Sequence, residues 1–96
     1  MVALADIQKQ RDQILHLAEQ HGARHVRLFG SVVRGQASPD SDLDVLVQFD
    51  DDRSLLDHVA LKQELEDLLG CRVDVVEDEA LYRSLKDRIL AEAVEL

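Results

Sequence analysis

The chain has 96 residues, of which 46% are hydrophobic and 32% charged, and its formal net charge is −9. A chain of this length and composition forms a globular domain with one core, which excludes a disordered tail. We therefore expect a single domain over residues 1–96. The acidic excess argues against direct nucleic-acid binding, because that affinity comes largely from Lys and Arg on phosphates. It is compatible with a basic partner or simply with solubility.

Nothing in the sequence indicates a membrane or secreted protein. No apolar run approaches the roughly 20 residues that cross a bilayer, and the N-terminus does not resemble a signal peptide. Cys71 is the only cysteine, so an internal disulfide is excluded, which suits a reducing compartment. We expect a cytoplasmic protein with no membrane contact.

Apolar periodicity and turn-forming residues divide the chain into six elements. We expect a helix over 4–20, strands over 25–30, 42–49 and 71–76, a helix between Ser54 and Gly70, and a last helix from about Ser84. Ser54 with Asp57, and Ser84 with Asp87, have the spacing of capping boxes. The residues expected to face the core include Val26, Leu28, Val45, Val47, Leu55, Val59 and Leu85. The order α-β-β-α-β-α predicts an α/β (α+β) fold, with helices flanking a small mixed β-sheet.

Two aspartates open the clearest strand, "DLDVLVQF". Because strand side chains alternate, Asp42 and Asp44 project on the same side, and parallel carboxylates repel each other unless a cation lies between them. Mg²⁺ prefers such oxygen ligands. Asp74 interrupts the apolar stretch "RVDVV". If that strand lies beside the first, three carboxylates can hold two metal ions for a phosphoryl transfer. The alternative is a capped turn with solvated edge residues.

A Gly-Ser pair precedes these aspartates. Gly30 lets the backbone approach a ligand closely, and Ser31 is expected to cap a helix whose N–H groups suit a phosphate. Arg34, one turn later, can add a guanidinium to the same anion. A turn around Pro39 then leads into the strand. Each feature alone is ordinary, but their order predicts phosphate donors followed by metal ligands.

The spacing resembles a known signature. Gly30-Ser31, ten residues and then Asp42-Leu43-Asp44 look like the motif of the DNA polymerase beta-type nucleotidyltransferase superfamily. The longer string "GSVVRGQASPDSDLDVLV" is similar to the minimal nucleotidyltransferases (MNT), many of which are antitoxins encoded beside HEPN-domain toxins. The resemblance extends from about Val26 to the C-terminus, and "VDVV" matches the strand of the third aspartate.

The resemblance implies a role for each residue of the motif. Asp42 and Asp44 would bind two Mg²⁺ ions and the triphosphate, and Asp74 would be the third metal-binding carboxylate, helping to activate the acceptor hydroxyl. The nucleotide phosphates would be held by Gly30, Ser31 and Arg34. The implied reaction transfers AMP from ATP to a tyrosine of the HEPN toxin, an RNase, with loss of pyrophosphate.

Two alternatives remain open from the sequence. The protein could neutralise a toxin by binding and masking it without catalysis, or it could transfer a nucleotide to a small molecule. In a chain of 96 residues we expect no second domain to hold the base and the acceptor. This favours a substrate site that is completed by a protein partner.

Overall fold

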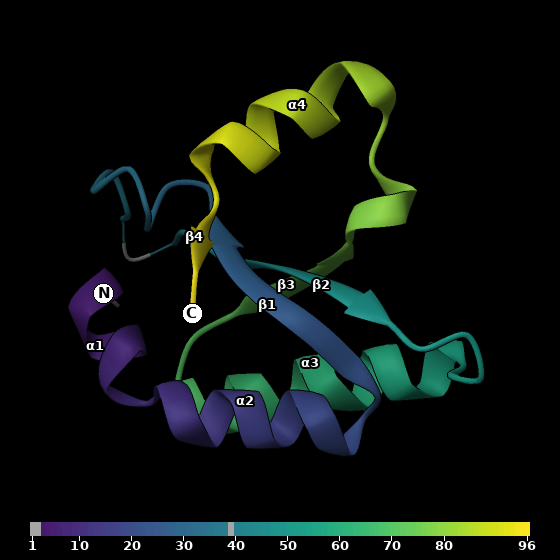
Figure 1. The fold of residues 1–96 in the computed structure, drawn as a ribbon. Helices are drawn as coiled ribbons and strands as arrows, with labels where there is room; N and C mark the ends of the chain where they lie inside the picture. The colour runs from purple at the N-terminus through teal and green to yellow at the C-terminus, as the bar shows by residue number, and fades with distance from the viewer. Residues whose placement is uncertain (1–2, 39) are drawn as a thin grey trace.

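The computed structural model describes residues 3–38 and 40–96, so the turn predicted at Pro39 lies outside the described residues at that position. The chain forms one mixed sheet with helices on both faces (Figure 1), which confirms the predicted α/β class. Its elements are α1 (Leu4–Lys9), α2 (Arg11–Gln20), β1 (Ala23–Phe29), β2 (Leu43–Phe49), α3 (Leu55–Leu69), β3 (Val73–Glu77), the 3₁₀ turn η1 (Asp78–Ala80), α4 (Arg83–Glu92) and β4 (Val94–Glu95).

The four strands lie in the order β3-β2-β1-β4. Strand β2 runs antiparallel to β1 and parallel to β3, and β4 pairs antiparallel with the outer side of β1. Because β2 and β3 are parallel, their N-terminal ends lie at the same edge of the sheet. The C-terminal end of β1 lies at that edge too, so three segments distant in sequence meet there.

The main core lies between the sheet and α1, α2 and α3, which cover one face (Figure 1). Val45 and Val47 of β2 and Val26 and Leu28 of β1 are all buried, as the strand alternation predicts. Helix α4 lies alone over the opposite face (Figure 1). Beneath it Arg27 and Asp78, 4% and 6% exposed, form an ion pair with 2.9 Å between Nη2 and Oδ2.

The middle helix begins and ends as predicted. The Ser54 hydroxyl accepts a hydrogen bond from the backbone N–H of Leu56, and the Asp57 carboxylate accepts from the backbone N–H of Ser54, which completes the capping box. Gly70 ends the helix in the left-handed conformation. Leu55 and Val59 were expected in the core but are 75% and 42% exposed, because the helix directs Leu61 and Leu65 into the sheet instead.

Three predictions about the outer helices are wrong. The single helix over 4–20 is broken at Gln10, which lets α1 turn across the end of the core while Ile7 and Ile14 both stay buried. The capping box at Ser84 does not form, because the N-cap of α4 is Tyr82, two residues before Ser84, and makes no side-chain cap. No residue of α4 is buried, and Leu85, which was expected in the core, is 44% exposed. In the described part of the chain, no helix is long and apolar enough to cross a bilayer.

Candidate active site

Asp44 lies at the centre of the edge where β1, β2 and β3 meet. Its Cα is paired with that of Phe29 on β1 and with that of Asp74 on β3. The pKa of Asp44 is raised to about 6 by partial burial, by the charges of Asp74 and Asp42, and by that of Glu92, although Arg34 lowers it. Asp44 is therefore a carboxylate at which a positive charge is strongly favoured.

Gly30 brings the main chain against this carboxylate. Its φ of +85° is in the left-handed region, and a Cβ on it would lie 2.0 Å from Oδ2 of Asp44. Only glycine fits both requirements. The backbone at Gly30 thus lies close to the Asp44 carboxylate, and its predicted approach to a ligand stays a prediction.

The segment after Gly30 is a turn, so the expectation that Ser31 caps a helix there is wrong. The backbone N–H of Arg34 donates to the carbonyl of Gly30 over 3.1 Å, and that of Gln36 donates to the carbonyl of Ser31 over 2.8 Å. The second bond closes the turn, with Gly35 at φ +71°. The turn still holds Ser31 and Arg34 beside Gly30.

Asp42 was predicted to be the first residue of the strand over 42–49, but it lies one residue before β2, which begins at Leu43. Its Oδ1 is 3.0 Å from Nε of Arg72, and both side chains are largely exposed. The backbone N–H of Leu43 donates to the carbonyl of Arg72 over 2.9 Å, which holds the two residues side by side. Arg72 was not anticipated as the partner of Asp42. Asp74 is exposed on β3, so Asp44 and Asp74 face a common edge while Asp42 is drawn toward Arg72.

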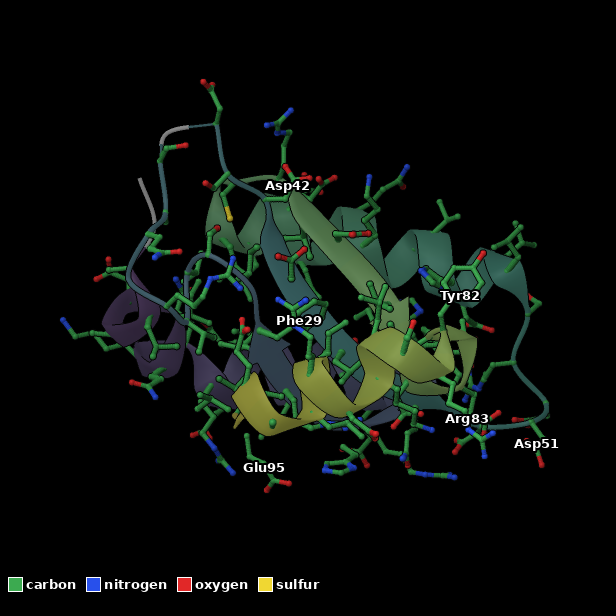
Figure 2. All side chains as sticks on the ribbon, turned by 90° about the horizontal axis from the view of Figure 1, so that it is seen from above. Phe29, Asp42, Asp51, Tyr82, Arg83 and Glu95 are labelled. Atoms are coloured by element: carbon green, nitrogen blue, oxygen red, sulfur yellow. The ribbon has the colours of Figure 1, made fainter. Side chains whose placement is uncertain are left out.

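Helix α4 closes the other side of the site, and in Figure 2 it crosses in front of the strand end that carries Phe29. A cavity of about 290 Å³ lies between them, with Gly30, Arg34 and Asp44 on one wall. The wall from α4 consists of Leu85, Arg88, Ile89 and Glu92. Their i, i+3, i+4, i+7 spacing is that of one helix face. Sequence reasoning missed Arg88 and Glu92, although two charges within an apolar stripe are a detectable signal.

Glu92 contacts the predicted phosphate donors directly. Its Oε1 accepts a hydrogen bond from the backbone N–H of Gly30 over 2.7 Å and another from Nη1 of Arg34 over 2.8 Å. These short, charge-assisted bonds show that the N–H of Gly30 and the guanidinium of Arg34 converge on one point. That point is an anion-binding position, and in this structure the anion is the carboxylate of Glu92.

The carboxylates have the chemistry of a Mg²⁺ site. Mg²⁺ usually takes one or two protein carboxylates and leaves its other positions to water and phosphate. Asp44 and Asp74 satisfy this on adjacent strands, and their repulsion contributes to the raised pKa of Asp44. Within residues 3–38 and 40–96, no three His, Cys, Asp or Glu side chains gather as a metal-binding group. Asp42 is paired with Arg72, and the three-carboxylate site stays a prediction.

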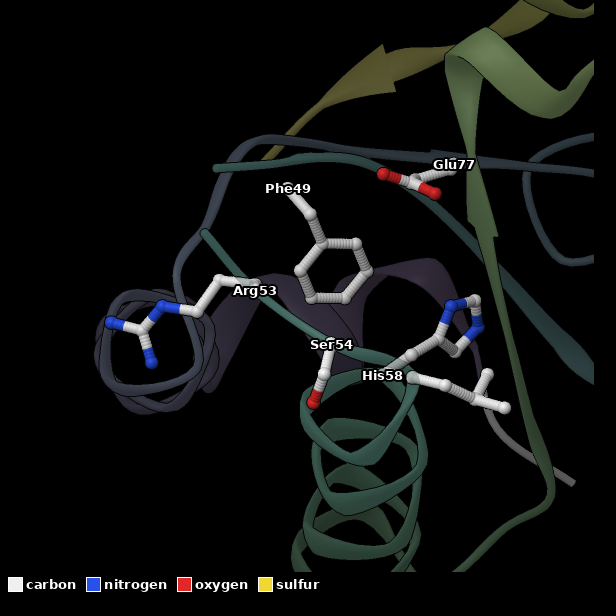
Figure 3. Close-up of a pocket in the computed structure, with 6 residues that line it drawn as sticks. Phe49, Arg53, Ser54, His58 and Glu77 are labelled. Atoms are coloured by element: carbon white, nitrogen blue, oxygen red, sulfur yellow. The ribbon is translucent and has the colours of Figure 1, made fainter. Parts of the chain in front are cut away.

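A second, smaller cavity of about 230 Å³ lies at the far end of β2 (Figure 3). Residues that line it include Phe49, Arg53, Ser54, His58 and Glu77. The rings of His58 and Phe49 stack with centroids 5.4 Å apart, and Nε2 of His58 lies 2.7 Å from the carbonyl oxygen of Val75. None of the predicted site residues lines this cavity, so it is separate from the candidate active site.

The fold and the site together define a class. A glycine-serine turn follows one strand, an Asp-x-Asp lies at the start of the next, and a third aspartate lies opposite on a parallel strand. That is the arrangement expected of a nucleotidyltransferase core. Residues 7–96 match the model of the nucleotidyltransferase domain, and the chain belongs to this family. It is a nucleotidyltransferase of the minimal type.

Known relatives agree with this assignment. The chain is 45% identical over 78 residues to the protein adenylyltransferase MntA of Thermococcus cleftensis, covering 81% of this chain and 79% of that protein. A solved structure described as a "putative minimal nucleotidyltransferase" is 48% identical, has a TM-score of 0.89, and covers 99% of this chain and 97% of its own.

More distant structures share the fold alone. One is a toxin–antitoxin complex with AMP-PNP, with a TM-score of 0.74 and 23% identity over 88% of this chain and 69% of that one. Another is a tri-AMPylated Shewanella oneidensis HEPN toxin in complex with its MNT antitoxin, with a TM-score of 0.69 and 21% identity over 92% of this chain and 69% of that one.

Proposed function

We propose that this nucleotidyltransferase is a protein adenylyltransferase that acts as an antitoxin. It transfers AMP from ATP to a tyrosine of a HEPN-type RNase toxin and thereby silences it. One observation carries the proposal: Asp44, Asp74 and the backbone of Gly30 meet at one sheet edge, in a chain 45% identical to a protein adenylyltransferase. The AMPylated toxin bound to an MNT antitoxin of similar fold supports the acceptor. Since an RNase toxin acts in the cytoplasm, the reaction is proposed to occur there.

The predicted site residues have separate roles in the proposed reaction. The N–H of Gly30 and the guanidinium of Arg34, which converge on one anion position, hold the phosphates of ATP, and the hydroxyl of Ser31 is proposed to assist them. The acceptor hydroxyl oxygen attacks the α-phosphorus while the bond to the bridging oxygen of pyrophosphate breaks. Asp74, exposed on β3, takes the hydroxyl proton. Pyrophosphate leaves, and AMP remains on the tyrosine oxygen.

Mg²⁺ would be held by Asp42, Asp44 and Asp74, whose hard oxygen ligands suit it. When bound, it neutralises charge on the phosphates and on the leaving pyrophosphate. Asp44 is the residue best placed to hold it, because it lies opposite Asp74 on the neighbouring strand and beside the end of β1.

The proposal is tested by intact mass spectrometry of the toxin encoded by the neighbouring gene. The toxin is incubated with this protein, Mg²⁺ and each nucleoside triphosphate in turn. We expect a gain of one or more AMP units with ATP, and none when Asp42→Asn/Asp44→Asn replaces the wild type. The matched control is Asp51→Asn/Asp52→Asn, which makes the same charge change in the exposed loop before α3.

Three results would contradict the proposal. AMP transfer by the Asp42→Asn/Asp44→Asn variant would show that the reaction does not require these carboxylates. A toxin that gains no mass, yet is silenced while it co-purifies with the protein, would establish masking in place of catalysis. A small-molecule acceptor is indicated if there is neither transfer to the toxin nor association with it.

A further inference from the structure

Glu92 holds the two groups that the reaction needs for phosphate. A single oxygen, Oε1, accepts both from the backbone N–H of Gly30, at 2.7 Å, and from Arg34, at 2.8 Å. The Glu92 side chain is 29% exposed and that of Arg34 is 48% exposed. A phosphate oxygen seeks the same kind of donors in the same geometry. The carboxylate and a phosphate therefore cannot occupy this position together.

We propose that Glu92 is an internal competitor of the nucleotide, and that α4 must withdraw this carboxylate before a triphosphate can bind. This rests on the proposed function only in taking Gly30 and Arg34 as the phosphate donors. The carboxylate keeps the donors of the turn aligned and shields them from other anions. The cost is a lower affinity for nucleotide, because only the fraction of molecules in which Glu92 has withdrawn can bind it.

Electrostatics makes the position of Glu92 unfavourable apart from these two contacts. It lines the same cavity as Asp44, and Asp42 and Asp74 lie near Asp44, so a fourth carboxylate adds repulsion. Arg34 and the N–H of Gly30 are what hold it there. A bound triphosphate takes both donors and repels Glu92, which drives the carboxylate out of the cavity.

Helix α4 is packed loosely enough to allow this withdrawal of Glu92. It has no fully buried residue, and Leu85 and Leu90 are 44% and 38% exposed. Neither end has a side-chain cap, and Ala93, with φ −62° and ψ 139°, makes an extended joint between α4 and β4. β4 stays paired with β1, so Ala93 can act as the hinge. Arg88 is one turn before Glu92 and lines the same cavity, so it offers a positive charge to the incoming phosphate.

The competition is tested by isothermal titration calorimetry of the full chain with inorganic tripolyphosphate, and separately with Mg²⁺ and AMP-PNP. The variant is Glu92→Gln, which keeps the size of the side chain and removes its charge. Glu95→Gln is the matched control, because Glu95 lies three residues further on, is exposed and pairs with His25. We expect Glu92→Gln to bind tripolyphosphate about tenfold more tightly than the wild type, and Glu95→Gln to bind it as the wild type does.

Nuclear magnetic resonance gives a second readout that needs no variant. The amide resonance of Gly30 in the wild type reports its bond to Glu92 and is expected to move as tripolyphosphate is added. The side-chain carboxyl carbon of Glu92 is expected to move with it, as the carboxylate is released. A Glu92 signal that stays in place while tripolyphosphate saturates the Gly30 amide overturns the proposal, whether or not Glu92→Gln folds.

The remaining outcomes separate this inference from the proposed function. Equal or weaker tripolyphosphate binding by a folded Glu92→Gln variant overturns the competition, even if the wild type transfers AMP to the toxin. Tighter binding by Glu92→Gln with no AMP transfer by either protein refutes the proposed function and leaves the competition standing. If neither protein binds tripolyphosphate, Gly30 and Arg34 do not form an anion-binding position, and the proposal is wrong.

Discussion

Replacing Asp44 with asparagine is expected to stabilise the folded protein at neutral pH and to have little effect near pH 4. Partial burial, Asp74 and Asp42 together raise the pKa of Asp44 from 3.8 to about 6. A raised folded-state pKa means that the folded protein prefers the protonated carboxyl. The wild type therefore loses stability as the pH rises from about 4 through 6, whereas asparagine does not titrate.

The size of the effect follows from the shift. One pKa unit corresponds to about 1.36 kcal/mol, so a shift of this size has an upper limit of about 3 kcal/mol. Asp44 is only partly buried, so solvent screening reduces the expected gain to about 1 kcal/mol. The free energy of unfolding is measured by urea denaturation at several pH values between 4 and 8.

All samples contain EDTA, because a bound cation favours the ionised carboxylate and offsets the gain. Asp67→Asn, an exposed site on α3, is the matched control and should show no comparable gain. The reasoning is refuted if Asp44→Asn gives the same change at pH 4 and pH 8. A destabilisation that grows with pH would refute it more strongly, because it would reverse the sign of the pKa shift.

Three further predictions concern the frame that holds the site. Asp78→Ala should lower the free energy of unfolding by about 3–5 kcal/mol, because it leaves the buried Arg27 unpaired, and adding Arg27→Met should restore part of the loss in urea denaturation. Gly30→Ala should cost at least about 1–2 kcal/mol in the same assay and abolish AMP transfer, because its Cβ would collide with the Asp44 carboxylate at a left-handed φ. Ser54→Ala should cost about 1 kcal/mol through loss of the α3 cap and leave the Kd for AMP-PNP, measured by calorimetry, unchanged.

The strands were the most predictable part of the fold. β2 and β3 are rich in branched apolar residues and are bounded by turn formers, and burial of Val45 and Val47 follows from their alternation alone. The two-residue strand β4 was not predicted. The helices were less predictable, because an amphipathic pattern does not specify which apolar residues find a surface to pack on. Leu55, in the first turn of α3, is 75% exposed, whereas Leu61 and Leu65 further along the same helix are buried.

The candidate metal-binding and phosphate-binding residues could be identified from short sequence motifs. Whether they lie close together in space depends on how the strands pair. Asp44 and Asp74 are 30 positions apart in the chain, and only the parallel register of β2 and β3 sets them opposite each other. The partner of Asp42 could not be read from its own motif. Arg72 contacts it because the carbonyl of Arg72 accepts from Leu43, and so fixes the entry of both strands.

Glu92 was not predicted as a site residue because the strand that positions it, β4, is very short. β4 is only two residues long, too short to leave a pattern in the sequence, yet it pairs antiparallel with β1 through Leu28 opposite Val94. In an antiparallel register, moving two residues forward on one strand means moving two back on the other. Gly30 is therefore brought opposite Glu92. The same short strand that completes the sheet delivers a carboxylate from the end of α4 to the N–H of Gly30, and Arg34 on the following turn meets the same oxygen. The register of the sheet thus places the end of α4 at the site, just as it places the ends of β1, β2 and β3.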